Sequence, residues 1–325
     1  MSALVAVTIL ISIAAMSLYA TFALRRYLRD GAHTHESAGR ASRWFSDYQP
    51  FLLPVFMIVF LVCVIVSTFH YSGNFLPDPP STPGSDVVSL FRVTAAITGA
   101  AFFLTQVLLF SFAFRFRKKT RTRATYLPEN LKLEFAWTII PLLAFLVLFL
   151  WGQKSWTRIV SAAPQNALEI EVVAEQFNWK VRYPGEDQKL GRSGFRFITD
   201  GNPMGLDESD ASGKDDFVPA QMHIPKNRVV KLLLWSKDVI HSFYVPYFRT
   251  KMDAVPGMTT TLHFTATATT DEMRARLSDP DFNYEVACAE LCGRMHFAMK
   301  LILVVDEPEQ YEKWALQQET LATVK

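Results

Sequence analysis

The chain has 325 residues, half of them hydrophobic and 26 of them Phe, and its formal net charge at pH 7 is +2. Lys and Arg lie beside apolar stretches instead of gathering on one polar element, which argues against nucleic acid as a partner. The composition fits either a large globular protein or a membrane protein, so the distribution of apolar residues has to decide between them.

Four nearly uncharged apolar stretches occupy the first half of the chain, at residues 3–24, 51–69, 88–114 and 136–152. A transmembrane helix needs about 20 such residues, and only the last stretch is near the lower limit. After residue 153 the sequence becomes mixed and polar. The pattern predicts four transmembrane helices, in contact with membrane lipid, followed by a domain outside the bilayer.

Basic residues are concentrated in the first and the last of the loops between these stretches, whereas the loop 70–87 has no Lys or Arg. By the positive-inside rule, both basic loops are cytoplasmic, which places the loop 70–87 and the region after residue 153 on the outer side. The basic residues are Arg25, Arg26, Arg29, Arg40, Arg43, Arg115, Arg117, Lys118, Lys119, Arg121, Arg123 and Lys132.

The first apolar stretch has two interpretations. It could be a cleaved signal peptide, but no basic segment precedes it and its charges follow the apolar run. We therefore expect an uncleaved helix whose amino terminus lies outside. His33 and His35, in the polar loop that follows, are expected to be solvated.

Two shorter features flank the later spans. Residues 71–87 contain four prolines, which fit neither a helix nor a central strand, and they predict a connector. Glu134 stands just before the last apolar stretch. A carboxylate at that point is favourable near the positive end of the helix dipole, which is a purely structural role.

Beyond residue 165 short β-type runs are separated by Gly, Pro, Asp and Asn. Seven or so strands in this region indicate an all-β sandwich or barrel, whose paired strands would bring the loops 238–246 and 288–299 together. The tail 309–324 reads as a helix. The expected strands are 168–174, 178–183, 195–198, 228–235, 259–264, 284–288 and 299–305.

The segment from Cys288 to Met299 holds two thiols, an imidazole and a thioether. Thiolate and thioether sulfur favour Cu(I) and imidazole binds either copper oxidation state, so the set indicates a redox copper. Two thiolates from one short loop, Cys288 and Cys292, can bridge two metals. The loop supplies one imidazole, His296, and His241 is the best candidate for a second.

Two other interpretations of the cysteines remain open. Outside the cytoplasm Cys288 and Cys292 could form a disulfide, although that would leave His296 and Met299 without a reason to stand at their spacing. A zinc site is the other alternative, but zinc sites are built mainly from Cys and His and seldom use Met.

Over about residues 88–310 the chain resembles subunit II of the haem-copper cytochrome c oxidases. The likeness rests on the cysteine segment, His241, Trp179 and the segments 134–141 and 251–257. It implies a binuclear copper centre, CuA. In that centre Cys288 and Cys292 bridge both coppers, His241 and Met299 complete one copper, and His296 and the Glu290 carbonyl complete the other.

The same resemblance assigns further roles. It implies that Glu134 marks a proton entrance leading to subunit I, and that the Glu290 carboxylate helps to bind Mg²⁺ shared with subunit I. Phe177 and Trp179 fall in the electron-entry region. The family commonly has Trp where this chain has Phe177, so the chain departs from the family pattern at this position.

The expected fold class is a membrane-anchored all-β protein, with four N-terminal transmembrane helices followed by a cupredoxin-like β-barrel. The expected domains are an extra N-terminal transmembrane hairpin (1–70), a periplasmic connector (71–87), the subunit II hairpin (88–152) and a periplasmic CuA domain with a C-terminal helix (153–325). The extra hairpin resembles the variety found in bacteria whose oxidase works with alternative complex III.

The resemblance implies an oxidoreductase subunit in the inner (plasma) membrane of a bacterium. Electrons from cytochrome c, or from a cytochrome c domain, would enter at CuA and pass to haem in subunit I. There dioxygen is reduced to water, coupled to proton translocation, in a complex with other oxidase subunits. Three alternative functions can be compared with this one. A quinol oxidase subunit would lack both cysteines, and a copper carrier would need a labile mononuclear site. A subunit of a nitric oxide reductase would differ only in its partner.

The insert 200–217 carries six acidic residues against the single Lys214. An acidic surface near the copper end could steer a basic cytochrome c domain toward the site. The alternative is an ordinary solvated loop.

The distribution of basic residues makes a testable prediction about topology. A tag placed in 30–45 or in 118–130 should react only with reagents applied from the cytoplasmic side, because the positive-inside rule holds both loops there. A tag in 71–87 is the control and should react only from the outer side. Protection of either basic loop from cytoplasmic labelling would contradict the topology.

Overall fold

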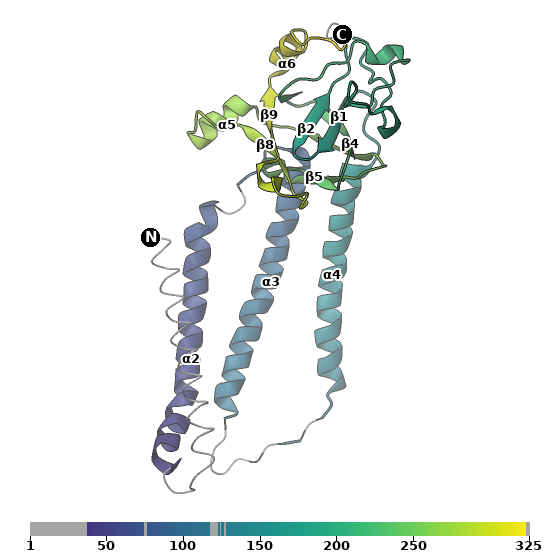
Figure 1. Ribbon diagram of the computed structural model, residues 1–325. Coiled ribbons are helices and arrows are strands. Elements are labelled where there is room, and N and C mark those ends of the chain that lie inside the picture. Colours follow the sequence, from purple (N-terminus) through teal and green to yellow (C-terminus); the bar gives the residue numbers. More distant parts are fainter. Residues whose placement is uncertain (1–37, 75–76, 118–122, 124, 127, 323–325) are drawn as a thin grey trace. The chain divides into compact units, whose positions relative to one another are not determined.

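The computed structural model (Figure 1) describes residues 38–322, apart from 75–76, 118–122, 124 and 127. The chain divides into two compact units. Of the described residues, those up to His70 and within Gly99–Tyr126 form one unit, and those within Tyr71–Thr98 and from Leu127 onward form the other. The β domain and the helix segments that reach it belong to the second unit.

Three helices in the described part of the chain are long and apolar enough to cross a membrane. They are α2 (Ala38–Tyr71), whose candidate span is Phe51–Tyr71, α3 (Thr82–Arg115) and α4 (Leu131–Val160). The structure therefore supports three spans where the sequence predicts four. The remaining prediction, residues 3–24, lies outside the described residues.

Two of these helices extend beyond their apolar stretches. α3 begins at Thr82, inside the predicted connector, and α4 continues to Val160, past the predicted end of the hairpin at residue 152. The added turns are buried where they meet the β domain, as Ile159 shows by belonging to that domain's core. Hydropathy marks only the part of a helix that lipid would cover, so the apolar stretch is shorter than the helix in both cases.

The start of α3 is fixed to the β domain. The Ser81 hydroxyl donates to the carbonyl of Phe248 at 2.9 Å, and the N–H of Thr267 donates to the carbonyl of Pro80 at 2.9 Å. A Cβ atom at Gly84 would lie 2.8 Å from the same Phe248 oxygen. Glycine is what permits the first turn of α3 to approach the domain this closely.

The β domain consists of two sheets, in the orders β2-β1-β4-β7 and β3-β9-β8-β5-β6. β1 pairs with β4 and β3 pairs with β9 in parallel, and the remaining ladders are antiparallel. The strands are β1 (Leu168–Glu175), β2 (Asn178–Arg182), β3 (Met222–Pro225), β4 (Val229–Ser236), β5 (His241–Val245), β6 (Thr250–Ala254), β7 (Thr260–Thr265), β8 (Tyr284–Cys288) and β9 (Lys300–Asp306).

The two sheets share one core. Ile170 and Leu232 from the first sheet and Phe243 and Leu303 from the second are fully buried in the same cluster. A closed barrel would need ladder hydrogen bonds all the way round the domain. Among the described strands, each sheet pairs only within itself. The domain is an open sandwich, and the expected barrel closure is wrong.

Six of the seven expected strands are confirmed to within one residue at each end. The expected strand 195–198 is wrong, because Phe195–Phe197 forms a 3₁₀ turn, η2, in which both Phe rings are exposed. The sequence misses β3, β5 and β6, which have four or five residues each. Such short strands are specified by their partners in the sheet more than by their own alternation.

The C-terminal helix is confirmed but shorter than expected, since α6 spans Pro308–Ala315 and not 309–324. Its Trp314 ring stacks on His223 with the centroids 4.2 Å apart. Beyond the helix the N–H of Leu321 donates to the carbonyl of Asp216 at 2.8 Å. The tail thus leaves the helix to pair with the insert.

A second short helix, α5 (Thr270–Leu277), was not expected and starts with a capping box at Thr269.

A buried charge network holds the insert against β1 and β2. Arg182 is 1% exposed, and it donates to Glu171 at 2.6 Å and to the carbonyl of Gly191 at 2.9 Å. It also pairs with Asp216, which is completely buried. Burial raises the pKa of Asp216 to about 6, although the guanidinium of Arg182 opposes this shift. Trp235 donates to Glu171 at 3.0 Å.

Removing the cation from this network should destabilise the domain strongly. We expect Arg182→Met to lower the free energy of unfolding by about 3–5 kcal/mol, because two buried carboxylates lose their partner. Denaturant titration in detergent, followed by Trp fluorescence, measures the change. The control is Lys300→Met, since Lys300 and Glu285 form a pair in which both side chains are 51% exposed. Such a pair contributes less than about 1 kcal/mol. Equal effects of the two substitutions would contradict the role of the network.

Candidate metal centre

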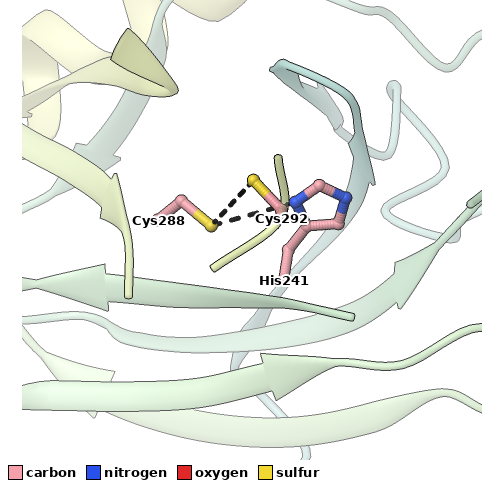
Figure 2. Close-up of side chains that lie close together, drawn as sticks. All are labelled: His241, Cys288 and Cys292. Carbon is pink, nitrogen blue, oxygen red and sulfur yellow. Dashed lines mark hydrogen bonds between the residues drawn. The ribbon is translucent and has the colours of Figure 1, made fainter. Parts of the chain in front are cut away.

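Three side chains from two neighbouring strands and a loop meet at one end of the sandwich. Figure 2 shows His241, Cys288 and Cys292 pointing toward one another. His241 is the first residue of β5, Cys288 is the last residue of β8, and Cys292 lies in the loop that follows. Their donor atoms all lie within 4.8 Å of one another.

The ladder between β5 and β8 explains why these residues meet. The strands run antiparallel with Phe243 opposite Cys288. Directly opposed residues share a face of the sheet, and so do residues two apart on one strand. His241 therefore lies on the same face as the Cys288 thiol. The N–H of Cys288 donates to the carbonyl of Met299 at 3.1 Å, which closes the base of the loop.

Each sulfur has its own imidazole neighbour. Sγ of Cys288 lies 3.8 Å from Nδ1 of His241 and 3.2 Å from the carbonyl oxygen of Glu290. Sγ of Cys292 lies 3.6 Å from Nδ1 of His296 and 3.8 Å from Sδ of Met299. The structure thus brings together every residue that the sequence names as a copper ligand.

The two cysteines are free. Their sulfur atoms are 3.8 Å apart, whereas a disulfide bond is about 2.05 Å long. In the structure, Cys288 and Cys292 are therefore not joined by a disulfide bond. The short distance between two thiols, with imidazole on both sides, is the arrangement that a metal would complete.

Most of the donor atoms are buried. His241 and Met299 are 0% exposed and Cys292 is 3% exposed, whereas His296 is half-buried and Glu290 is exposed. The cluster therefore closes toward the core of the domain. It reaches the surface on the side of His296 and Glu290.

Asp238 sets the orientation of the His241 ring. Its Oδ1 lies 2.8 Å from Nε2 of His241, and its Oδ2 accepts from the N–H of Gln176 at 2.7 Å. Burial on its own would raise the pKa of Asp238, but the hydrogen bonds from His241, Gln176 and Val239 lower it below its usual value. An ionised Asp238 requires the proton on Nε2, so the lone pair of Nδ1 faces Cys288, as a metal ligand needs.

Burial also affects the acidity of Cys292. Burial, together with the adjacent Cys288 thiol, raises the pKa of Cys292 to about 11. At neutral pH the metal-free thiol is therefore protonated. A metal ion must displace that proton, which couples binding to proton release.

The two aromatic residues of the predicted electron-entry region lie beside the cluster. Trp179 is buried, and its ring meets the His241 ring edge-on with the centroids 6.0 Å apart. Its Nε1 is a buried atom without a hydrogen-bond partner in the described part of the chain. Phe177 is partly buried and packs against the core.

Glu134 and the acidic insert lie apart from the cluster. Glu134 sits in the first turn of α4, where its Oε1 accepts from the N–H of Asn130 at 3.2 Å, so it does serve the helix start. In the insert, Arg192 pairs with Asp207 at 3.0 Å and with Asp210 at 3.3 Å, and Asp216 is buried against Arg182. The insert is a weaker acidic surface than its composition predicts, because Asp207, Asp210 and Asp216 have cationic partners.

Three residues near the cluster were not recognised as functional in the sequence. Asp238 orients His241, the Gln176 amide donates to the carbonyl of Cys292 at 2.5 Å, and Gly293 lies under the ring of Phe177. An acid three residues before His241 and a glycine directly after Cys292 were the available signals. The glutamine carries none, because its partner is 116 residues away.

Comparison with known proteins assigns the family. The model of the cytochrome c oxidase subunit II periplasmic domain matches residues 168–306. The alternative cytochrome c oxidase subunit 2 of Bradyrhizobium diazoefficiens is 35% identical, covering 83% of this chain and 94% of that protein. The cytochrome c oxidase subunit 2 of Thermostichus vulcanus is 30% identical, covering 78% of this chain and 81% of that protein.

A crystal structure of the periplasmic domain of cytochrome oxidase subunit II from Bradyrhizobium japonicum covers 48% of this chain and 95% of that chain. Its identity is 25% and the TM-score is 0.33. The two sequence relatives match over most of their own length as well as most of this chain. The chain therefore belongs to the cytochrome c oxidase subunit II family, whose members are subunits of oxidoreductases.

Proposed function

We propose that this chain carries a binuclear copper centre of the CuA type. It would accept electrons from cytochrome c and pass them to haem in subunit I, for reduction of dioxygen to water coupled to proton translocation. The observation that carries the proposal is the pair of sulfurs 3.8 Å apart with one imidazole nitrogen beside each. A mononuclear blue copper site uses a single Cys, and the second thiol here would then have no purpose.

The ligand roles follow from the same geometry and from the family. Cys288 and Cys292 would bridge the two ions. His241 and Met299 would complete one ion, and His296 with the carbonyl of Glu290 would complete the other. When bound, the copper pair supplies one-electron transfer with little change of geometry.

The chain's own residues prepare this site in three ways. The β5–β8 ladder presents His241 and Cys288 on one face of the sheet. Burial keeps water from His241, Cys292 and Met299 and leaves their positions to packing. Asp238 holds the proton on Nε2 of His241, so that Nδ1 is free to bind metal. The ligand geometry is therefore largely prepared before metal binds.

Electron entry and Mg²⁺ binding belong to the same proposal. Phe177 and Trp179 lie on the side of His241 and Cys292, so a donor that docks there approaches the sulfurs through aromatic rings. Glu290 is exposed while its carbonyl faces Cys288. Its carboxylate is thus free to serve as a hard oxygen ligand for Mg²⁺ shared with subunit I.

The proposed location is the inner membrane of a bacterium, with the β domain in the periplasm. It is supported by the three candidate spans and by the basic loops that flank them. The proposed partners are subunit I and other oxidase subunits, with cytochrome c or a cytochrome c domain as donor. An alternative complex III is the partner suggested for the additional N-terminal helices.

The copper centre is tested on the full chain purified in mild detergent. We expect two copper ions per chain and an electron paramagnetic resonance spectrum of one unpaired electron shared by both ions. Cys292→Ser should leave a mononuclear or empty site, because only one bridging sulfur remains. Cys63→Ser, in α2, is the matched control and should not alter the spectrum. A four-line spectrum from a single copper in the wild-type chain would exclude the binuclear centre.

Glu134 is proposed as the entrance of a proton path into subunit I. Glu134→Gln keeps an oxygen that can accept from the N–H of Asn130, so the helix start is preserved while the ionisable group is lost. In the intact oxidase complex we expect reduction of the oxygen-binding site to slow by about tenfold or more. Electron transfer into the copper centre should stay unchanged. Glu129→Gln, in the preceding loop, is the control, and equal turnover of both variants would leave Glu134 with its structural role alone.

A further inference from the structure

The turn between β1 and β2, formed by Gln176 and Phe177, touches both segments that carry the proposed ligands. These strands belong to the sheet β2-β1-β4-β7, whereas His241 and Cys288 lie on strands of the other sheet. The 176–177 turn is therefore a contact across the sandwich, made at the end where the sulfurs meet.

The first contact reaches His241. The backbone N–H of Gln176 donates to Oδ2 of Asp238 at 2.7 Å, and Oδ1 of the same carboxylate lies 2.8 Å from Nε2 of His241. The carboxylate bridges the turn and the imidazole. A displacement of the turn would thus be transmitted to the His241 ring through two charge-assisted hydrogen bonds.

The second contact reaches Cys292. The side-chain amide of Gln176 donates to the carbonyl of Cys292 at 2.5 Å. Cys292 lies in the middle of a loop whose base is closed by the bond between Cys288 and Met299. Within the loop the N–H of His296 donates to the carbonyl of Gly293 at 3.2 Å, whereas the carbonyl of Cys292 accepts from Gln176, outside the loop.

Gly293 shows how closely the turn and the loop approach. A Cβ at this position would lie 3.0 Å from Nε2 of Gln176 and 3.0 Å from the ring of Phe177. The backbone also has φ +138°, a conformation that L side chains rarely adopt. Both facts indicate that the loop is built to lie directly beneath the 176–177 turn.

We propose that Gln176 is a positioning residue that sets the place of the Cys292 sulfur relative to the His241 imidazole. It acts on one side through the carbonyl of Cys292 and on the other through Asp238. This inference rests on the proposed copper function. It adds a residue that touches none of the donor atoms and that nevertheless determines the geometry between them.

The test uses the full chain in mild detergent, loaded with copper. Gln176→Ala removes the amide donor, and a single hydrogen bond of this kind corresponds to about a three- to tenfold change in an equilibrium or a rate. We expect copper to pass to a Cu(I) chelator faster by about that factor, with a shift of the electron paramagnetic resonance hyperfine pattern. Gln176→Glu should have at least as large an effect, because a carboxylate has the same shape and cannot donate.

The matched control is Asn178→Ala. Asn178 lies next to the turn, and its side chain accepts from the N–H of its own neighbour Trp179 at 2.8 Å. It should leave the copper spectrum and the release rate unchanged. Gly293→Ala should act in the same direction as Gln176→Ala, because the added methyl group pushes against the ring of Phe177.

A second measurement keeps the inference testable without metal. In the copper-free chain, alkylation of Cys292, followed by mass spectrometry, should be faster in Gln176→Ala by a similar factor, because the loop is released. A wild-type chain without a binuclear copper spectrum would refute the proposed function. A wild-type chain with that spectrum, alongside Gln176 variants that match it in spectrum, copper release and alkylation, would overturn the role of Gln176 alone.

Discussion

The ladder between β5 and β8 is the interaction on which the candidate metal centre depends. It places Phe243 opposite Cys288, and it continues into the loop through the N–H of Ala289, which donates to the carbonyl of Ser242 at 2.9 Å. A slip of one residue would turn His241 to the other face of the sheet and separate it from the thiols. The complete burial of His241 and Phe243 makes such a slip costly, so packing specifies the register.

Burial also sets the chemistry of the donor atoms. Cys288, Cys292 and Met299 belong to the same cluster as the core of the sandwich, so the site is the polar end of a hydrophobic interior. That setting raises the pKa of Cys292, while Asp238 keeps the proton of His241 away from the sulfurs. The two effects differ in what metal binding must change. Nδ1 of His241 already faces the sulfurs, whereas the Cys292 thiol must first release its proton.

The β domain is attached to its helices by specific contacts as well as by the chain itself. Ser81 anchors the start of α3, Ile159 of α4 enters the core, and Arg158 pairs with Asp86 at 2.7 Å between the two helices. Glu134 lies at the other end of α4, about 40 Å from Ile159 along the helix at 1.5 Å per residue. Such attachment fixes the position of the cysteine cluster relative to the ends of α3 and α4 that meet the β domain.

Local patterns in the sequence determined much of this protein. Hydropathy located three of the spans, alternation located six strands, and the spacing from Cys288 to Met299 specified a soft donor set, because each signal lies within one continuous stretch of the chain. Only the tertiary structure showed that His241 begins a strand and that Asp238 and Gln176 hold the ligand segments. It also showed that Arg182 neutralises Asp216. Those contacts join residues 34 to 116 positions apart, apart from the Asp238–His241 pair. No local pattern records such pairs, since folding alone brings them together.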